Sequence, residues 1–125
     1  MDSESLAAAG LLAALSRAAE LLSGLHHPFV RSAPFTYLIP PAGARTGTTF
    51  TLPDGREATF AVSIVVRSGA FHVEGAAAVE GEDLLRLPAK STHDIHAALA
   101  VLDEHAAELA QPAGRLLDQL LDEIV

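Results

Sequence analysis

Histidine is the residue type in this chain with the clearest capacity for catalysis or metal binding. The chain has six His and no Cys, so its sequence offers no thiolate ligand and no thiol nucleophile. His93 and His96 are three residues apart in a segment with helical periodicity, so their imidazoles can share one helix face. His72 could join them only through the tertiary fold. Two ligands in local reach predict neither a tight metal site nor a cofactor.

Motifs for covalent or phosphoryl-transfer chemistry do not occur in the sequence. It contains no G-x-S-x-G, no H-E-x-x-H and no G-x-x-x-x-G-K-[ST]. His72 and Glu74 alternate in a way that is typical of a solvated strand face. We therefore predict a protein without catalytic residues. The alternative is a small enzyme, or a metal- or ligand-binding protein, that uses His93, His96 and His72.

Acidic residues are concentrated in the last third of the chain. The formal net charge is −8, from 16 Asp and Glu against eight Lys and Arg, which argues against a nucleic-acid partner. Residues 80–125 hold ten of the acids and three of the bases. Such a surface attracts a basic protein partner by electrostatic steering, or it only solubilises the chain. The predicted partner-binding residues are Asp103, Glu104 and Glu108.

The N-terminal segment predicts a helix over residues 3–23 with apolar side chains on several of its sides. Leucines and alanines recur at spacings of three and four, as on an amphipathic helix. Gly24 can form the C-cap of this helix, and Pro28 prevents its continuation. Arg17 and Glu20 interrupt the apolar run, so the segment is not expected to cross a membrane. We predict a cytoplasmic protein that does not bind a membrane.

Residues 34–79 change to the period of two that is typical of strands. Apolar or alternating runs predict strands at 35–39, 48–52, 59–67 and 71–80, with a further short piece at 84–87. Between the first two, residues 42–48 are small and are interpreted as a connecting loop. Ser68-Gly69 is a two-residue hairpin signal between the third and fourth strands.

Two helices are predicted at the C-terminus. Ser91 and Asp94 have the spacing of a capping box in which Ser91 is the N-cap, and a stripe of apolar residues follows to Leu109. Pro112 then starts a second amphipathic helix. We expect the first stripe to pack against the strand face that carries Phe60, or against the N-terminal helix.

The order of the elements predicts one α+β domain over residues 1–125. It has two layers, in which an antiparallel sheet of four to five strands packs with an N-terminal helix and two C-terminal helices. Apolar surface left on the N-terminal helix favours a homodimer. In size, acidity and element order the chain is similar to bacterial secretion chaperones and to small immunity proteins that neutralise basic toxins. The resemblance implies an acidic bacterial protein-binding module, either an adaptor or one of these two kinds, and it includes no motif.

Overall fold

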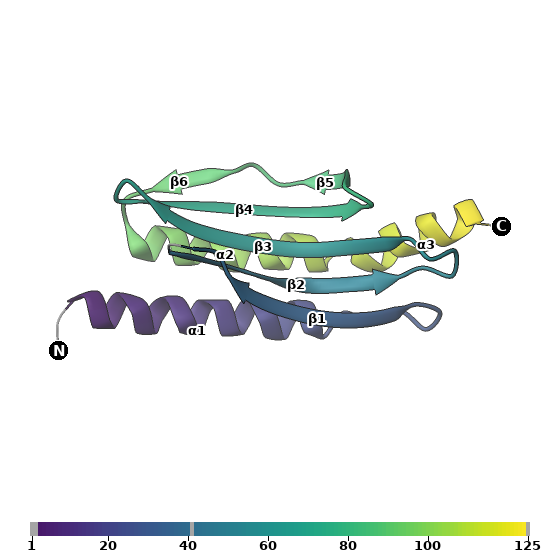
Figure 1. Ribbon diagram of the computed structural model, residues 1–125, viewed down its shortest axis with the longest axis horizontal. Helices are drawn as coiled ribbons and strands as arrows, with labels where there is room; N and C mark the ends of the chain where they lie inside the picture. The colour runs from purple at the N-terminus through teal and green to yellow at the C-terminus, as the bar shows by residue number, and fades with distance from the viewer. Residues whose placement is uncertain (1–2, 41, 125) are drawn as a thin grey trace.

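The computed structural model describes residues 3–40 and 42–124, with residues 3–12 described by their backbone only. It is an α+β fold with an antiparallel sheet, as predicted. In chain order the elements are α1 (Ser3–Ser23), β1 (Arg31–Leu38), β2 (Gly43–Thr51), β3 (Glu57–Arg67), β4 (Ala70–Val79), β5 (Glu82–Arg86), β6 (Lys90–Thr92), α2 (Ile95–Ala110) and α3 (Ala113–Ile124) (Figure 1). None of the helices in the described ranges is both long enough and apolar enough to cross a membrane.

The sheet is a meander with the strand order β1-β2-β3-β4-β5. The short strand β6 also pairs with β4, so β5 and β6 are two successive pieces along the same edge. Hairpins connect the strands, and the predicted Ser68-Gly69 turn is confirmed. Both of its residues have positive φ, as a type I′ turn requires (52° for Ser68 and 76° for Gly69).

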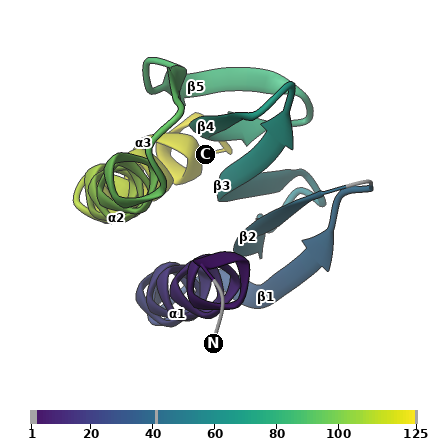
Figure 2. The same ribbon diagram turned by 90° about the vertical axis from the view of Figure 1, so that its left-hand side faces the viewer.

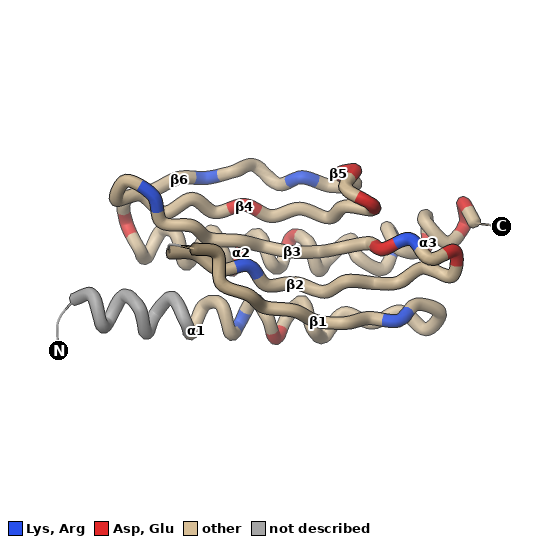
Figure 3. Tube along the Cα trace, viewed as in Figure 1, with Lys and Arg blue, Asp and Glu red and all other residues tan. Residues whose placement is uncertain are grey.

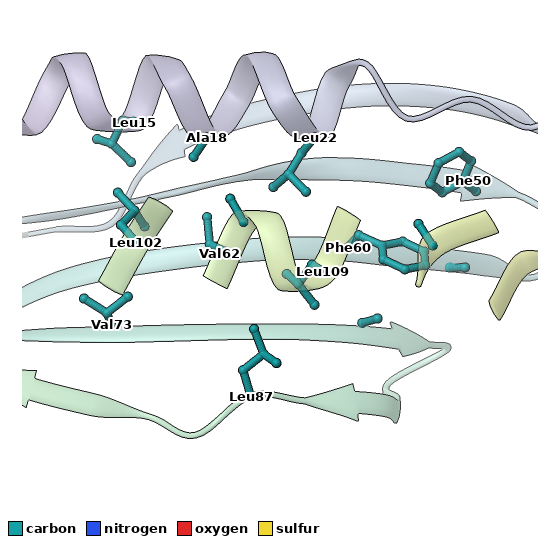
Figure 4. Close-up of a cluster of buried hydrophobic side chains, with 14 of the residues drawn as sticks. Leu15, Ala18, Leu22, Phe50, Phe60, Val62, Val73, Leu87, Leu102 and Leu109 are labelled. Carbon is teal, nitrogen blue, oxygen red and sulfur yellow. The ribbon is translucent and has the colours of Figure 1, made fainter. Parts of the chain in front are cut away.

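Helices α1 and α2 lie side by side on one face of the sheet, and none of the described helices lies on the other face (Figure 2). The core fills the space between the two layers (Figure 4). Leu22 of α1, Phe60 of β3 and Leu102 of α2 are each 0% exposed and belong to it. The apolar stripe on α2 therefore packs against both the sheet and α1. The two predicted packing partners, the strand face of Phe60 and the N-terminal helix, are both confirmed.

Thr48 ties α1 to the sheet from inside this core. Its side chain is 0% exposed, and its hydroxyl donates to the Leu22 carbonyl at 2.7 Å. Leu22 lies in the last turn of α1, and its carbonyl also accepts from the backbone N–H of Leu25 at 3.2 Å. Thr48 thus supplies a second, shorter hydrogen bond to a carbonyl at the buried helix end.

Gly47 is required by a close approach of β2 to β3. A Cβ atom at this position would lie 2.2 Å from the Phe60 carbonyl oxygen and 2.8 Å from the Cα of Ala61. No side chain fits there without a backbone shift. Because a glycine-rich run has neither bulk nor alternation, residues 42–48 were interpreted as a loop. That prediction is wrong, since β2 already begins at Gly43.

The predicted cap of the first C-terminal helix is also wrong. Ser91 belongs to β6, and Asp94 is the residue that caps α2. The Asp94 carboxylate accepts a hydrogen bond from the backbone N–H of His96 at 3.1 Å. The hydroxyl of Thr92 in turn accepts one from the N–H of Asp94 at 3.1 Å, so the segment 92–94 leads from strand to helix.

Candidate functional site

Two of the three histidines of the alternative hypothesis, His72 and His93, bind neighbouring groups of the chain through their rings. His72 Nδ1 lies 2.7 Å from the Ser91 hydroxyl, across the β4–β6 pair. His93 Nδ1 donates to the Gly69 carbonyl at 3.2 Å, while His96 is exposed on the first turn of α2. Within residues 3–40 and 42–124 there is no group of three or more His, Asp or Glu side chains that could hold a metal ion.

His105 is a core residue. It is 2% exposed, and its Nε2–H donates to the Pro88 carbonyl at 3.0 Å. Its ring contacts the space above Gly75, where a Cβ atom would lie 3.4 Å from the imidazole and 3.2 Å from Leu87. Because a carbonyl oxygen can only accept, this bond fixes the tautomer that carries its proton on Nε2. His105 thereby fastens the β5–β6 connection to α2.

The three predicted partner-binding residues are divided between two sides of α2. Asp103 lies on the α1 side, where its carboxylate accepts from the Arg17 guanidinium at 3.1 Å. Glu104 and Glu108 are exposed, and no ion pair of the described residues includes them. The structure therefore separates Asp103 from the other two.

Glu108 lines an apolar groove of about 560 Å³ where β5, α2 and α3 meet. Leucines and a proline form most of this groove, and its polar rim consists of a carboxylate, an amide and a guanidinium. The lining residues are Leu84, Leu85, Leu87, Glu108, Gln111, Pro112, Arg115 and Leu116. Leu84 is 38% exposed, so apolar surface is open to solvent beside an acidic helix face.

Other acids of the helical layer form contacts within the chain. The Asp118 carboxylate of α3 accepts a hydrogen bond from His27 Nε2 at 2.7 Å, and a carboxylate oxygen of Glu123 lies 4.0 Å from the Arg56 guanidinium. Arg56 also binds Asp54 in the β2–β3 turn. The backbone N–H of Arg56 is the largest cause of a lowered pKa for Asp54, relative to its ordinary value of 3.8.

The open face of the sheet holds a second arrangement, centred on Arg45 of β2. The Phe35 and Tyr37 rings of β1 stack with their centroids 5.9 Å apart, and the Arg45 guanidinium lies 5.8 Å from the centre of the Phe35 ring. Arg45 also donates to the Tyr37 hydroxyl at 3.2 Å. An arginine that lies over one aromatic ring and is bonded to the hydroxyl of the next is positioned before any ligand arrives.

A hollow of about 350 Å³ crosses the open face beside these aromatic residues. Its floor consists of small side chains of the central strands, Ala61, Ser63 and Ala76. Arg45 stands on one side of this floor, and Glu74 of β4 stands on the other, with the Asp83–Arg86 ion pair of β5 beyond it. A lone guanidinium therefore faces a lone carboxylate across the floor.

The sequence alone predicts neither the groove between β5, α2 and α3 nor the hollow on the open face of the sheet. The groove depends on Leu84 and Leu116, which are far apart in the chain, and no sequence pattern shows that they meet. The open face could have been noticed, because Ala61 and Ser63 alternate with the apolar residues of β3 and are too small for an ordinary solvated strand face. Comparison of the chain with protein-family models, curated proteins and solved structures finds no significant match to any of them.

Proposed function

We propose that the protein is an acidic protein-binding module that docks a basic segment of a partner protein in the groove between β5, α2 and α3. The observation that carries this proposal is the position of Glu108 on the wall of an open apolar groove. Protein interfaces combine apolar anchors with a charged rim, and this groove offers both. The proposal keeps the expectation of a bacterial, cytoplasmic and homodimeric protein.

The charge of the helical layer supports a basic partner. Helices α2 and α3 contain six acids and one base, Arg115. Three of the acids are in intramolecular contacts, and Glu104, Glu108 and Asp122 have no ion-pair partner among the described residues. Such charges raise the rate of association, and the buried leucines set most of the affinity.

The test separates these two contributions in a partner captured from the native cell extract. The association rate should fall between low and physiological salt, as the Debye length contracts to about 8 Å. Glu104→Lys with Glu108→Lys should slow association further, whereas Leu84→Ala should mainly speed dissociation.

Asp103→Asn supplies the matched control, because this carboxylate is bound to Arg17 on the other side of α2. It should leave the association rate nearly unchanged. If the partner's association rate is indifferent both to salt and to the double charge reversal, the acidic surface only solubilises the protein and the proposal is wrong.

A further inference from the structure

The open face of the sheet carries opposite charges on its two sides. On this face β1 and β2 carry Arg31 and Arg45 and no acid, whereas β4 and β5 carry Glu74, Asp83 and Arg86, of which Asp83 and Arg86 lie 3.6 Å apart in an ion pair. Figure 3 shows a cation on β2 and an acid on β4 on opposite sides of β3, with further cations on β5 and β6. In the register, Arg45 pairs with Ser63, and Ser63 pairs with Glu74. The cation and the carboxylate therefore flank one small residue of the central strand.

We propose that this face binds a second copy of the same chain about a two-fold axis that runs parallel to β3. Rotation about such an axis places β2 of one copy over β4 of the other. Each Arg45 then meets Glu74 of the second copy, which forms two equivalent ion pairs from one surface. A two-fold interface is self-complementary in this way, because each contact occurs twice.

The shape of the face permits two sheets to approach. Ala61 is 4% exposed, and together with Ser63 it forms the floor of the hollow under the proposed axis. Stacked sheets pack about 10 Å apart with their strands about 30° from parallel, and small central side chains allow that distance. Phe35 and Tyr37 stand beyond Arg45 and would be covered by the edge of the second sheet.

The area of the face is sufficient for a stable dimer. Five strands about 4.8 Å apart, each contributing about eight residues that rise about 3.3 Å, cover about 600 Å². Two copies would bury about 1,200 Å², the lower end of the range of about 1,200–2,000 Å² found for stable interfaces. The groove of the proposed function lies against α2 and α3, so it would stay accessible in this dimer.

Other routes to self-association are weaker in the described residues. The N–H of Ile39 donates to the Gly43 carbonyl of the neighbouring strand. The even-numbered residues of β1, which include Pro34, therefore direct their backbone N–H and C=O groups away from β2, toward the free edge of the sheet. Pro34 has no N–H to offer an added strand, and Pro88 interrupts the opposite edge between β5 and β6. On α1, Leu15 and Leu22 are buried within the monomer, and Leu21, which is 43% exposed, is the one large apolar side chain that the described part of this helix presents to solvent.

Charge reversal tests the proposal by sedimentation from low to high micromolar protein. The wild-type chain should dimerise, and Arg45→Glu and Glu74→Arg should each raise the dissociation constant by at least about tenfold, because like charges then oppose each other. A mixture of the two single variants should form a mixed dimer with nearly wild-type affinity, since both pairs are restored with reversed sign. Arg115→Glu, on the helical side, is the control and should change nothing.

Two outcomes would overturn the proposal. A wild-type chain that stays monomeric at high micromolar concentration has no such interface. A dimer whose affinity is unchanged by both single reversals, or two weakened variants whose mixture does not recover, would assign self-association to another surface. Neither outcome affects docking at the groove, because that test measures binding of a different protein to Glu108 and Leu84.

Discussion

The two faces of β3 differ more than a buried and a solvated face usually do. Toward the helices the strand presents Phe60, Val62 and Ile64, each at most 1% exposed. Toward the open side the middle of the strand presents Ala61 and Ser63, between Thr59 and Val65. A solvated strand face commonly carries long polar or β-branched side chains that contact their cross-strand neighbours. The small residues here contribute little to such contacts and leave a hollow instead.

This difference shows which constraint acts on each face. Burial against α1 and α2 determines the helix-covered face, because every large side chain there removes apolar area from water. The close approach to Gly47 explains why residue 61 is small, but folding does not explain Ser63, which is only half-buried and has room for a larger side chain. Arg45, positioned on Phe35 and Tyr37 beside that hollow, is consistent with a surface built for contact.

The largest expected effect comes from deleting a core side chain of the helix-covered face. Phe60→Ala should lower the free energy of unfolding by about 3–5 kcal/mol, because Phe60 is fully buried and packs edge-on against Phe50 at 5.6 Å. Ser63→Ala, three residues along the same strand on the open face, should change it by less than about 0.5 kcal/mol. Urea denaturation measures both, and a comparable loss for Ser63→Ala would show that the open face is also a packed layer.

Gly47 lies on the open face, but a substitution there should lower stability, as one in the core does. Gly47→Ala should cost about 1–3 kcal/mol, since the new Cβ would overlap the Phe60 carbonyl and force β2 and β3 apart. The matched control is Gly114→Ala in α3, where a Cβ atom meets nothing within 4 Å.

That control should raise stability by about 0.5 kcal/mol, because alanine favours helix over glycine. Thermal unfolding of the two variants gives the comparison directly. Equal shifts in Tm would mean that the strands separate at Gly47 without strain.

The sequence predicts the helix-covered face well, because the spacing of apolar residues along a helix or strand follows which side chains are buried. The helix over residues 3–23 has the bounds that the structure gives, and the alternation around Phe60 identifies the side that packs. The start of β2 was missed because Gly43 and Gly47 carry no side chain that could show a period of two. At α2, Ser91 and Asp94 both fit the chemistry of a cap, and only the register of β6 decides between them.

The candidate surfaces depend on contacts between distant segments, which local patterns do not encode. Glu108 was predicted at a partner-binding surface from charge alone, and its place beside Leu84 follows from the packing of β5 against the helices. Asp103 looked equivalent to Glu104 in the sequence, but α1 lies beside it and provides Arg17. Which strands flank Ser63, and so the opposition of Arg45 and Glu74, follows only from the strand order.

The smallest of these effects concerns two neighbouring threonines of β2 that point to opposite faces. Thr48 is buried and donates to the Leu22 carbonyl at 2.7 Å, whereas Thr49 is half-buried on the open side and pairs with Thr59 at 3.3 Å. Thr48→Val keeps the shape of the side chain and removes the donor. It should cost about 1 kcal/mol, because the Leu22 carbonyl keeps the N–H of Leu25 but loses the shorter of its two hydrogen bonds at a buried position.

Thr49→Val is the matched control for this prediction, with the same substitution one residue along the strand. It should change the free energy of unfolding by no more than about 0.5 kcal/mol, since the Thr59 hydroxyl can bind water once its neighbour is gone. Chemical denaturation of both variants, combined with hydrogen exchange at the last turn of α1, distinguishes the two positions. Faster exchange in that turn is expected for Thr48→Val alone. Equal losses of stability, with no local change in exchange, would show that the bond to Leu22 does not hold the helix end to the sheet.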